Sequence, residues 1–246
     1  MPEHELWLTR LFNDSLAPLG RSLLALVNVN AENPGRPWTN FITMQIVLAL
    51  LIIVLFAILR PLLSMDRPGK LQHIFEIIYL FLKGETQDNI GHTGPQYLPF
   101  LCTLFIFILF SNLLGVIPGF ESPTMNPAVP AGCALLVFCY YNFMGFKQMG
   151  VGKYLAHFAG PMPALAILMV PIEIVSHLAR PLSLTIRLFA NMLAGEKVTM
   201  VFLGLTYLVA PAIFMGLHVF VSFLQAYIFV LLTMMYVADT VPHEEH

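Results

Sequence analysis

The stretch Arg180-Pro-Leu-Ser-Leu-Thr-Ile-Arg187-Leu-Phe-Ala-Asn-Met-Leu-Ala-Gly-Glu196 decides the fold class, because it places two arginines and a glutamate in a strongly apolar part of the chain. An arginine at the centre of a bilayer costs roughly 2.5–3.5 kcal/mol on insertion scales, so ionisable residues in such segments are usually functional. Arginine also keeps its proton at physiological pH. A fixed positive charge in an apolar setting repels cations and attracts an ionised carboxylate, which is the behaviour expected of a gate.

The overall composition is that of a membrane protein. Hydrophobic residues make up 58% of the 246 residues, charged residues 11%, and the mean hydropathy is +0.78. A soluble domain of average composition is far less apolar. The chain has no basic patch of the kind that binds nucleic acid, so nucleic acid is not expected as a partner. The three cysteines have neither metal-ligand nor redox spacing, so we expect no metal and no cofactor.

The apolar runs predict an all-α polytopic membrane protein with about five membrane-embedded helices. Residues 1–37 are mixed and polar, with asparagines and a proline before residue 38, and are interpreted as an external tail. Residues 38–246 are expected to form a single membrane domain. The predicted spans are residues 41–60, 97–115, 128–146, 160–196 and 198–238.

Residues 68–84, between the first two spans, have apolar side chains at helical spacing and polar side chains at the other positions. This pattern predicts an amphipathic helix that lies in the membrane interface. A helix packed on another subunit would have the same pattern, so both interpretations stay open.

The last apolar segment, 198–238, contains no Asp, Glu, Lys or Arg. As one helix it would be about 60 Å long, twice the thickness of the hydrocarbon core. Either Pro211 divides it into two short spans, or one long helix is steeply tilted; the polar face of this segment favours the second. We therefore expect the last two helices to be long, tilted and arranged as a hairpin.

Loop charges predict the orientation in the membrane. The stretch 60–96 contains Arg60, Arg67, Lys70 and Lys83, and two lysines follow at 147–153, whereas the loop 115–127 contains no basic residue. The positive-inside rule places the two basic loops in the cytoplasm. With five spans the N-terminus is then outside and the C-terminus cytoplasmic.

Polar residues form one face on each of the last two helices. At 100° per residue, five positions of the fourth span fall within about 80° of one another. Glu196 points to the opposite side. Two facing polar stripes would enclose aqueous clefts. The members of the first stripe are Glu173, His177, Arg180, Arg187 and Asn191, and those of the second include His218, Ser222 and Gln225.

The run Arg187-Leu-Phe-Ala-Asn-Met-Leu-Ala-Gly-Glu196, followed by His218 and Gln225 seven residues apart, resembles subunit a of bacterial F-type ATP synthases. Pro-Gly-Lys-Leu-Gln at 68–72 and Ser-Asn-Leu at 111–113 extend the likeness. The resemblance implies a non-catalytic, multi-pass subunit of the cell inner membrane. It further implies a stationary position beside a rotating ring of c subunits, a peripheral stalk of subunit b as neighbour, and two offset half-channels that bring protons to the ring carboxylates.

The resemblance also implies roles for individual residues. Arg187 corresponds to the stator arginine that faces the ring carboxylate, and Gln225 to the glutamine near it. Glu196, His218 and Asn112 correspond to the external half-channel. Asn191 corresponds to the asparagine one turn beyond the arginine, and Glu173 to the glutamate of the cytoplasmic half-channel. Three further candidates come from the polar stripes alone: His177, Arg180 and Ser222.

Plainer interpretations apply to some of these side chains. Arg180 would also be explained by a side chain that reaches the membrane interface. His177 follows Glu173 by four residues and would equally be its structural partner.

Two other classes of membrane protein were considered. A secondary transporter would show internal repeats, and we find none. An intramembrane serine protease would need an activated serine, and Ser183 lacks such a setting. His218 favours protons over sodium as the transported ion.

Overall fold

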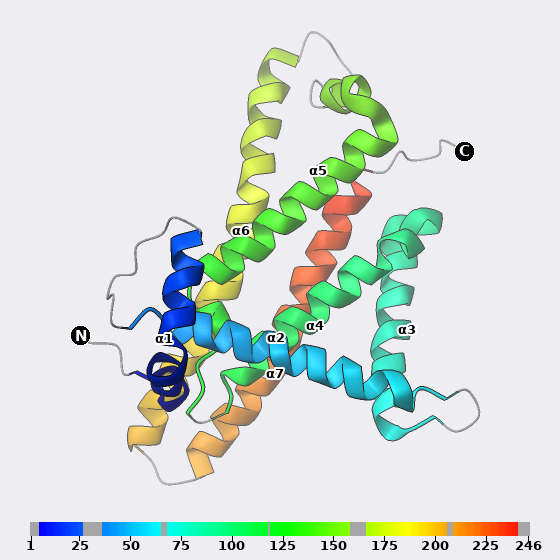
Figure 1. The fold of residues 1–246 in the computed structure, drawn as a ribbon. Coiled ribbons are helices and arrows are strands. Elements are labelled where there is room, and N and C mark those ends of the chain that lie inside the picture. Colours follow the sequence, from blue (N-terminus) through cyan, green and yellow to red (C-terminus); the bar gives the residue numbers. More distant parts are fainter. Residues whose placement is uncertain are drawn as a thin grey trace.

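The computed structural model describes residues 5–26, 36–64, 68–117, 119–157, 166–205 and 209–240, and within these ranges it is helical without any strand (Figure 1). The all-α prediction is therefore confirmed. The elements are α1 (Trp7–Leu26), α2 (Asn40–Leu62), α3 (Lys70–Ile90), η1 (Gly91–Gln96), α4 (Leu98–Leu114), η2 (Pro123–Met125), α5 (Ala128–His157), α6 (Ala166–Leu205) and α7 (Val209–Ala238).

The helices confirm a polytopic membrane protein. Within the described ranges, three stretches are long and apolar enough to cross a bilayer alone: Asn40–Leu62, Ala128–Gly150 and Ala212–Ala238. A fourth candidate combines Lys70–Gln96 with Leu98–Leu114, two segments bent by 117° relative to each other. The bend follows Gln96, whereas Gly91 joins α3 to η1 with φ +80°, a left-handed conformation that glycine adopts without steric cost. The bend separates the amphipathic α3 from the apolar α4.

The core lies where α4, α5, α6 and α7 meet. On α6, Leu184, Leu188 and Met192 are spaced by four residues and are at most 1% exposed, so they form one buried stripe. They pack in a common cluster with residues of α4 and α7, including Phe105 and Phe229. Arg187 and Asn191 each come one residue before a member of this stripe and therefore lie beside it on α6. Burial of the apolar stripe thus fixes the direction in which these two polar side chains point.

The last two helices form the expected long hairpin (Figure 1). α6 has 40 residues, a length of about 60 Å as a helix, and Pro171 and Pro181 lie inside it. It continues to Leu205 instead of ending near 196, because no helix-breaking residue follows Glu196 directly. α7 begins at Val209, so Pro211 lies in its first turn, where a missing N–H costs little. The segment 198–238 is thus divided near Pro211 and is not one helix.

Part of the N-terminal region is helical, which its polar composition did not predict. Residues 7–26 form α1, which is kinked at Leu16, two residues before Pro18. Its buried residues, among them Thr9, Asn13 and Gly20, lie on the side that packs against the chain just before α2. The asparagines and proline between residues 27 and 35 lie outside the described residues.

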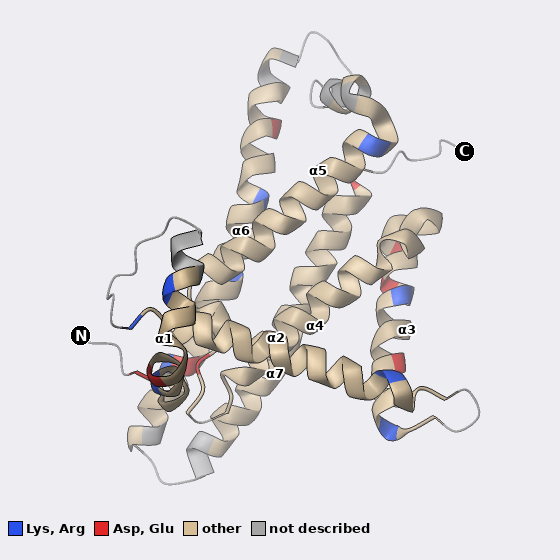
Figure 2. Ribbon diagram, viewed as in Figure 1, with Lys and Arg blue, Asp and Glu red and all other residues tan. Residues whose placement is uncertain are grey.

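Charged side chains are scarce along the spanning helices and concentrate at their ends, along α3 and on α6 (Figure 2). α6 is the exception among the long helices because charged residues lie along its length. These residues are Glu173, Arg180, Arg187, Glu196 and Lys197.

Candidate functional site

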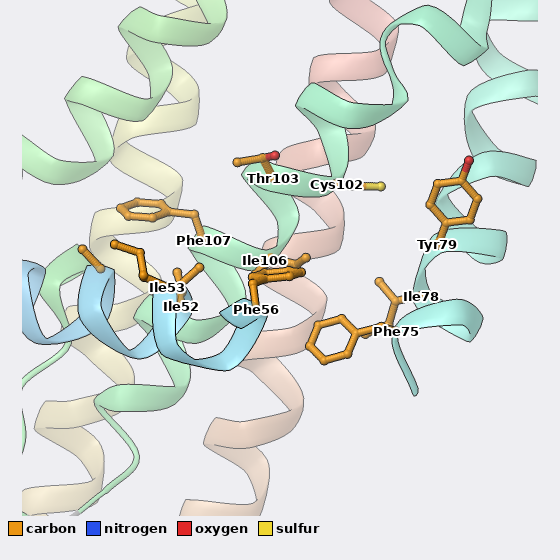
Figure 3. Close-up of a pocket in the computed structure, with 11 residues that line it drawn as sticks. Ile52, Ile53, Phe56, Phe75, Ile78, Tyr79, Cys102, Thr103, Ile106 and Phe107 are labelled. Atoms are coloured by element: carbon orange, nitrogen blue, oxygen red, sulfur yellow. The ribbon is translucent and has the colours of Figure 1, made fainter. Parts of the chain in front are cut away.

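A cavity of about 520 Å³ lies between α2, α3 and α4. Figure 3 shows that Phe56, Phe75, Ile78 and Ile106 are among its lining side chains. None of the residues that line it is Asp, Glu, Lys, Arg or His. A site that transfers protons needs groups that bind and release them. The candidate residues instead lie along α6 and α7.

Arg187 lies near the middle of α6 and is half-buried. It forms no ion pair with a carboxylate in the part of the chain that the structure describes. Glu173, the intrahelical partner considered above, is 4.0 Å from the guanidinium of Arg180 instead. Arg187 is close enough to Tyr236 of α7 to interact with it electrostatically. The positive charge of Arg187 is therefore available to a group outside this chain.

Asn191 and Gln225 join α6 to α7 one turn beyond Arg187. The Asn191 amide nitrogen Nδ2 donates a hydrogen bond of 2.7 Å to Oε1 of Gln225. Gln225 is only 1% exposed, and its own amide nitrogen Nε2 has no hydrogen-bond partner among the described residues. The contact fixes the rotation of both helices at the level of the arginine.

Glu196 and His218 are both buried, at 8% and 6% exposure, on facing turns of α6 and α7. Gly195, next to Glu196 on α6, contacts His218. A Cβ atom added at Gly195 would lie 3.2 Å from Nε2 of His218, so the imidazole packs directly against the backbone of α6. A cavity of about 230 Å³ is lined by Asn191, Gly195 and His218, among others. Glu196 is not among the residues that line it.

Asn112 reaches the same part of α7 from α4. Its side-chain oxygen Oδ1 accepts a 2.8 Å hydrogen bond from the Thr124 hydroxyl, and its Nδ2 lies 3.5 Å from the backbone oxygen of Ser222. Ser122 contacts Thr124 and donates to the backbone oxygen of Ser111. This buried network ties α4 and η2 to α7, one turn from His218.

Four buried polar atoms in this region lack a hydrogen-bond partner among the described residues. A buried polar group left unsatisfied costs about 1–3 kcal/mol, so such groups normally bind water or another polar partner. Three of them lie on one face of α7 at i, i+4 and i+7. They indicate a hydrated path along α7. The atoms are Glu196 Oε2, His218 Nε2, Ser222 Oγ and Gln225 Nε2.

A second polar cluster lies toward the other end of α6. Arg180 Nη2 is 2.9 Å from Asp239 Oδ2, and the Arg180 guanidinium carbon is 5.0 Å from the centroid of the Tyr236 ring. The Arg180 side chain is only 19% exposed. The side chain is therefore held by α7 and by Glu173 and does not simply extend to the interface.

His177 belongs to the same cluster through α5. Its Nε2 is 2.9 Å from Asn142 Oδ1 and 3.3 Å from the Tyr141 hydroxyl. The Tyr154 hydroxyl donates to the same Asn142 oxygen at 2.9 Å. Asn142 thus links α5 to α6, a contact that the spacing of His177 and Glu173 did not predict.

The two clusters lie on opposite sides of Arg187 along α6. Glu173 and Glu196 are separated by about 35 Å along the helix axis at 1.5 Å per residue.

A sequence profile of the ATP synthase A chain family matches residues 41–238. ATP synthase subunit a of Solibacter usitatus is 66% identical over 234 residues, which cover 95% of this chain and 100% of the relative. This chain belongs to the ATP synthase subunit a family.

Two further relatives have lower sequence identity to this chain. ATP synthase subunit a of Koribacter versatilis is 44% identical over 240 residues, 98% of each chain. That of Aquifex aeolicus is 39% identical over 189 residues, which cover 73% of this chain and 87% of the relative. Membership in the subunit a family associates this multi-pass membrane protein with ATP synthesis and ion transport.

Sequence reasoning missed Asp239, although a signal for it was present. Asp239 is the first carboxylate after the long uncharged segment that ends at residue 238. A carboxylate at the end of an apolar helix commonly pairs with a basic side chain on the neighbouring helix. The sequence alone did not say that the partner is Arg180, because that depends on how α6 and α7 are aligned.

Gly195 offers a local test of the contact between α6 and His218. Replacing Gly195 with Val should displace the imidazole and slow ATP-driven proton pumping by about tenfold, because overpacking of this kind costs about 1–3 kcal/mol. Gly195→Ala should have a smaller effect. Gly204→Val is the matched control on the same helix, since no atom lies within 4 Å of a Cβ there. Equal rates for Gly195→Val and Gly204→Val would contradict the contact.

Proposed function

We propose that this chain is the stationary proton-conducting subunit of an F-type ATP synthase, with two offset half-channels that serve the carboxylates of a rotating c ring. The observation that carries the proposal is the position of Arg187, whose charge is unpaired within the described chain and lies between two polar clusters. The chain itself makes and breaks no covalent bond.

The first half-channel is formed by Glu196, His218 and Asn112, with Ser222 beside them. Their buried, unsatisfied polar atoms favour water in the space between α4, α6 and α7. Protons enter from outside past Glu196 and His218 and neutralise a ring carboxylate. The neutral carboxyl group then moves into lipid, where an ionised carboxylate would be costly.

The second half-channel is formed by Glu173, Arg180 and Asp239, next to His177. After nearly a full turn of the ring, the carboxyl group reaches this cluster and releases its proton toward the cytoplasm. Arg187 stabilises the ionised carboxylate between the two clefts. Its permanent charge prevents protons from passing directly from one cleft to the other.

Apolar stripes on α6 and α7 support contact with the ring. On α6, Leu178, Leu182 and Ile186 follow at intervals of four residues and are 54–60% exposed. On α7, exposed apolar residues follow one another at i, i+4, i+7 and i+11: Ile213, Leu217, Phe220 and Leu224. These stripes border the polar residues and suit an apolar partner such as a ring of helices. The basic loops favour an external N-terminus and a cytoplasmic C-terminus.

The function is tested with the complete ATP synthase reconstituted in vesicles. ATP addition should quench a pH-sensitive dye, and the quenching should not depend on sodium. Sodium-dependent pumping would show that sodium, and not the proton, is the transported ion. Absence of any ATP-driven transport, with the chain assembled beside a c ring, would contradict the proposal.

Asp239 should matter for the second half-channel. We expect Asp239→Asn to slow pumping roughly two- to fivefold, the change produced by about 0.5–1 kcal/mol for a partly exposed ion pair. Asp239→Glu keeps the charge and should retain most of the rate. If Asp239→Asn pumps as fast as the unmodified complex, Asp239 is not part of the exit route.

A further inference from the structure

α1 lies across the N-terminal end of α2 (Figure 1) and is bound there by specific hydrogen bonds. The Asn13 side chain donates to the backbone oxygen of Trp38 at 3.1 Å and accepts from its backbone nitrogen at 3.0 Å. The Trp38 indole nitrogen donates to the Leu16 oxygen at 2.9 Å. The Leu6 nitrogen donates to Asn40 Oδ1 at 3.2 Å. These hydrogen bonds attach α1 before its kink and at the kink itself.

Close packing adds to this attachment. A Cβ atom added at Gly20 would lie 2.9 Å from Pro37 Cγ and from the Trp38 ring, so the second half of α1 touches the same segment. Phe12 packs edge-on against Trp38, with ring centroids 5.9 Å apart, and Glu5 forms an ion pair with Arg36. α1 is thus a docked part of the fold.

This attachment fixes the depth of α1. α2 is a membrane span that begins at Asn40. A helix is about 10–12 Å wide, so a helix packed on Trp38 lies within about one helix diameter of the start of the span. The polar interface between hydrocarbon and bulk water is about 5–7 Å thick on each side, so a helix at this distance reaches it. α1 therefore lies at the level of the lipid headgroups.

The outward surface of α1 suits that position. Trp7 is 61% exposed and Leu11 55% exposed, and they are one helical turn apart on the same side. Arg10 is also exposed, at 100° from Leu11 around the helix. Tryptophan is enriched at membrane interfaces, and arginine beside it contacts headgroups.

We propose that α1 is an interfacial membrane helix whose Trp7–Leu11 side inserts into the headgroup region of the bilayer on the side where α2 begins. The partner is the lipid surface. The helix anchors the N-terminal end of the first span and does not take part in the proton path.

The first experiment uses the two tryptophans of the chain. Trp38→Phe leaves Trp7 as the single fluorophore of the full chain in phosphatidylcholine vesicles. Lipids brominated near the headgroup end of the acyl chain should quench its emission at least about twofold more than aqueous iodide does. Stronger quenching by iodide than by the brominated lipids would overturn the proposal.

The second experiment uses the assembled complex and a subunit without Cys102, Cys133 and Cys139. Spin labels are placed by Leu11→Cys and, as the matched control, Arg10→Cys. The Leu11 label should collide more with oxygen than with a water-soluble nickel chelate, and the Arg10 label should show the reverse. A Leu11 label that is immobile and shielded from both reagents would identify another subunit as the partner and overturn the proposal.

Discussion

Replacing Arg187 with alanine should leave the subunit inserted and assembled but reduce ATP-driven proton pumping and coupled ATP synthesis to background. The reason is that no other described side chain supplies an unpaired positive charge at this level of α6. Loss of one partner of a buried ion pair costs about 3–5 kcal/mol, a factor of more than about 100. Dye quenching in reconstituted vesicles measures pumping, and co-purification of the c ring measures assembly.

Arg187→Lys should also fail, because an ammonium cannot reproduce the planar fork of a guanidinium and can lose its proton when buried. Arg60→Ala is the control, since Arg60 is an exposed arginine at the end of α2, away from α6 and α7. Pumping by Arg187→Ala at a rate near that of Arg60→Ala would refute the gate.

The second large effect concerns the side from which each cleft is reached. In a subunit without its three native cysteines, Glu196→Cys should react with a membrane-impermeant thiol reagent added outside. Glu173→Cys should react with the same reagent added inside. The physical reason is the separation of about 35 Å along one helix, with Arg187 between the two positions.

Ile53→Cys is the control for this labelling. Ile53 is 63% exposed on a membrane span, so its cysteine should be shielded by lipid from both sides. Labelling of Glu196→Cys and Glu173→Cys from the same side would exclude two half-channels that open to opposite sides. It would leave family membership untouched, because that rests on the sequence match over residues 41–238.

The sequence by itself determined the fold class and the positions of the main polar residues. Long, continuous apolar runs favour helices in a membrane, because a helix satisfies its backbone hydrogen bonds within the segment. Helical periodicity then placed Glu173, His177, Arg180, Arg187 and Asn191 on one face. Both conclusions depend on local properties, namely side-chain polarity and spacing of 3.6 residues per turn.

Only the tertiary structure decided which of these residues meet a partner. Arg180 is paired with Asp239, a residue 59 positions later, whereas Arg187 has no such partner in the described chain. Packing also set His218 against Gly195 and docked α1 on Trp38. Such contacts depend on how far α6 and α7 slide and rotate against each other, and on where a polar N-terminal segment finds a binding surface. Periodicity within one helix contains no information on either, because it is unchanged when two helices shift relative to each other.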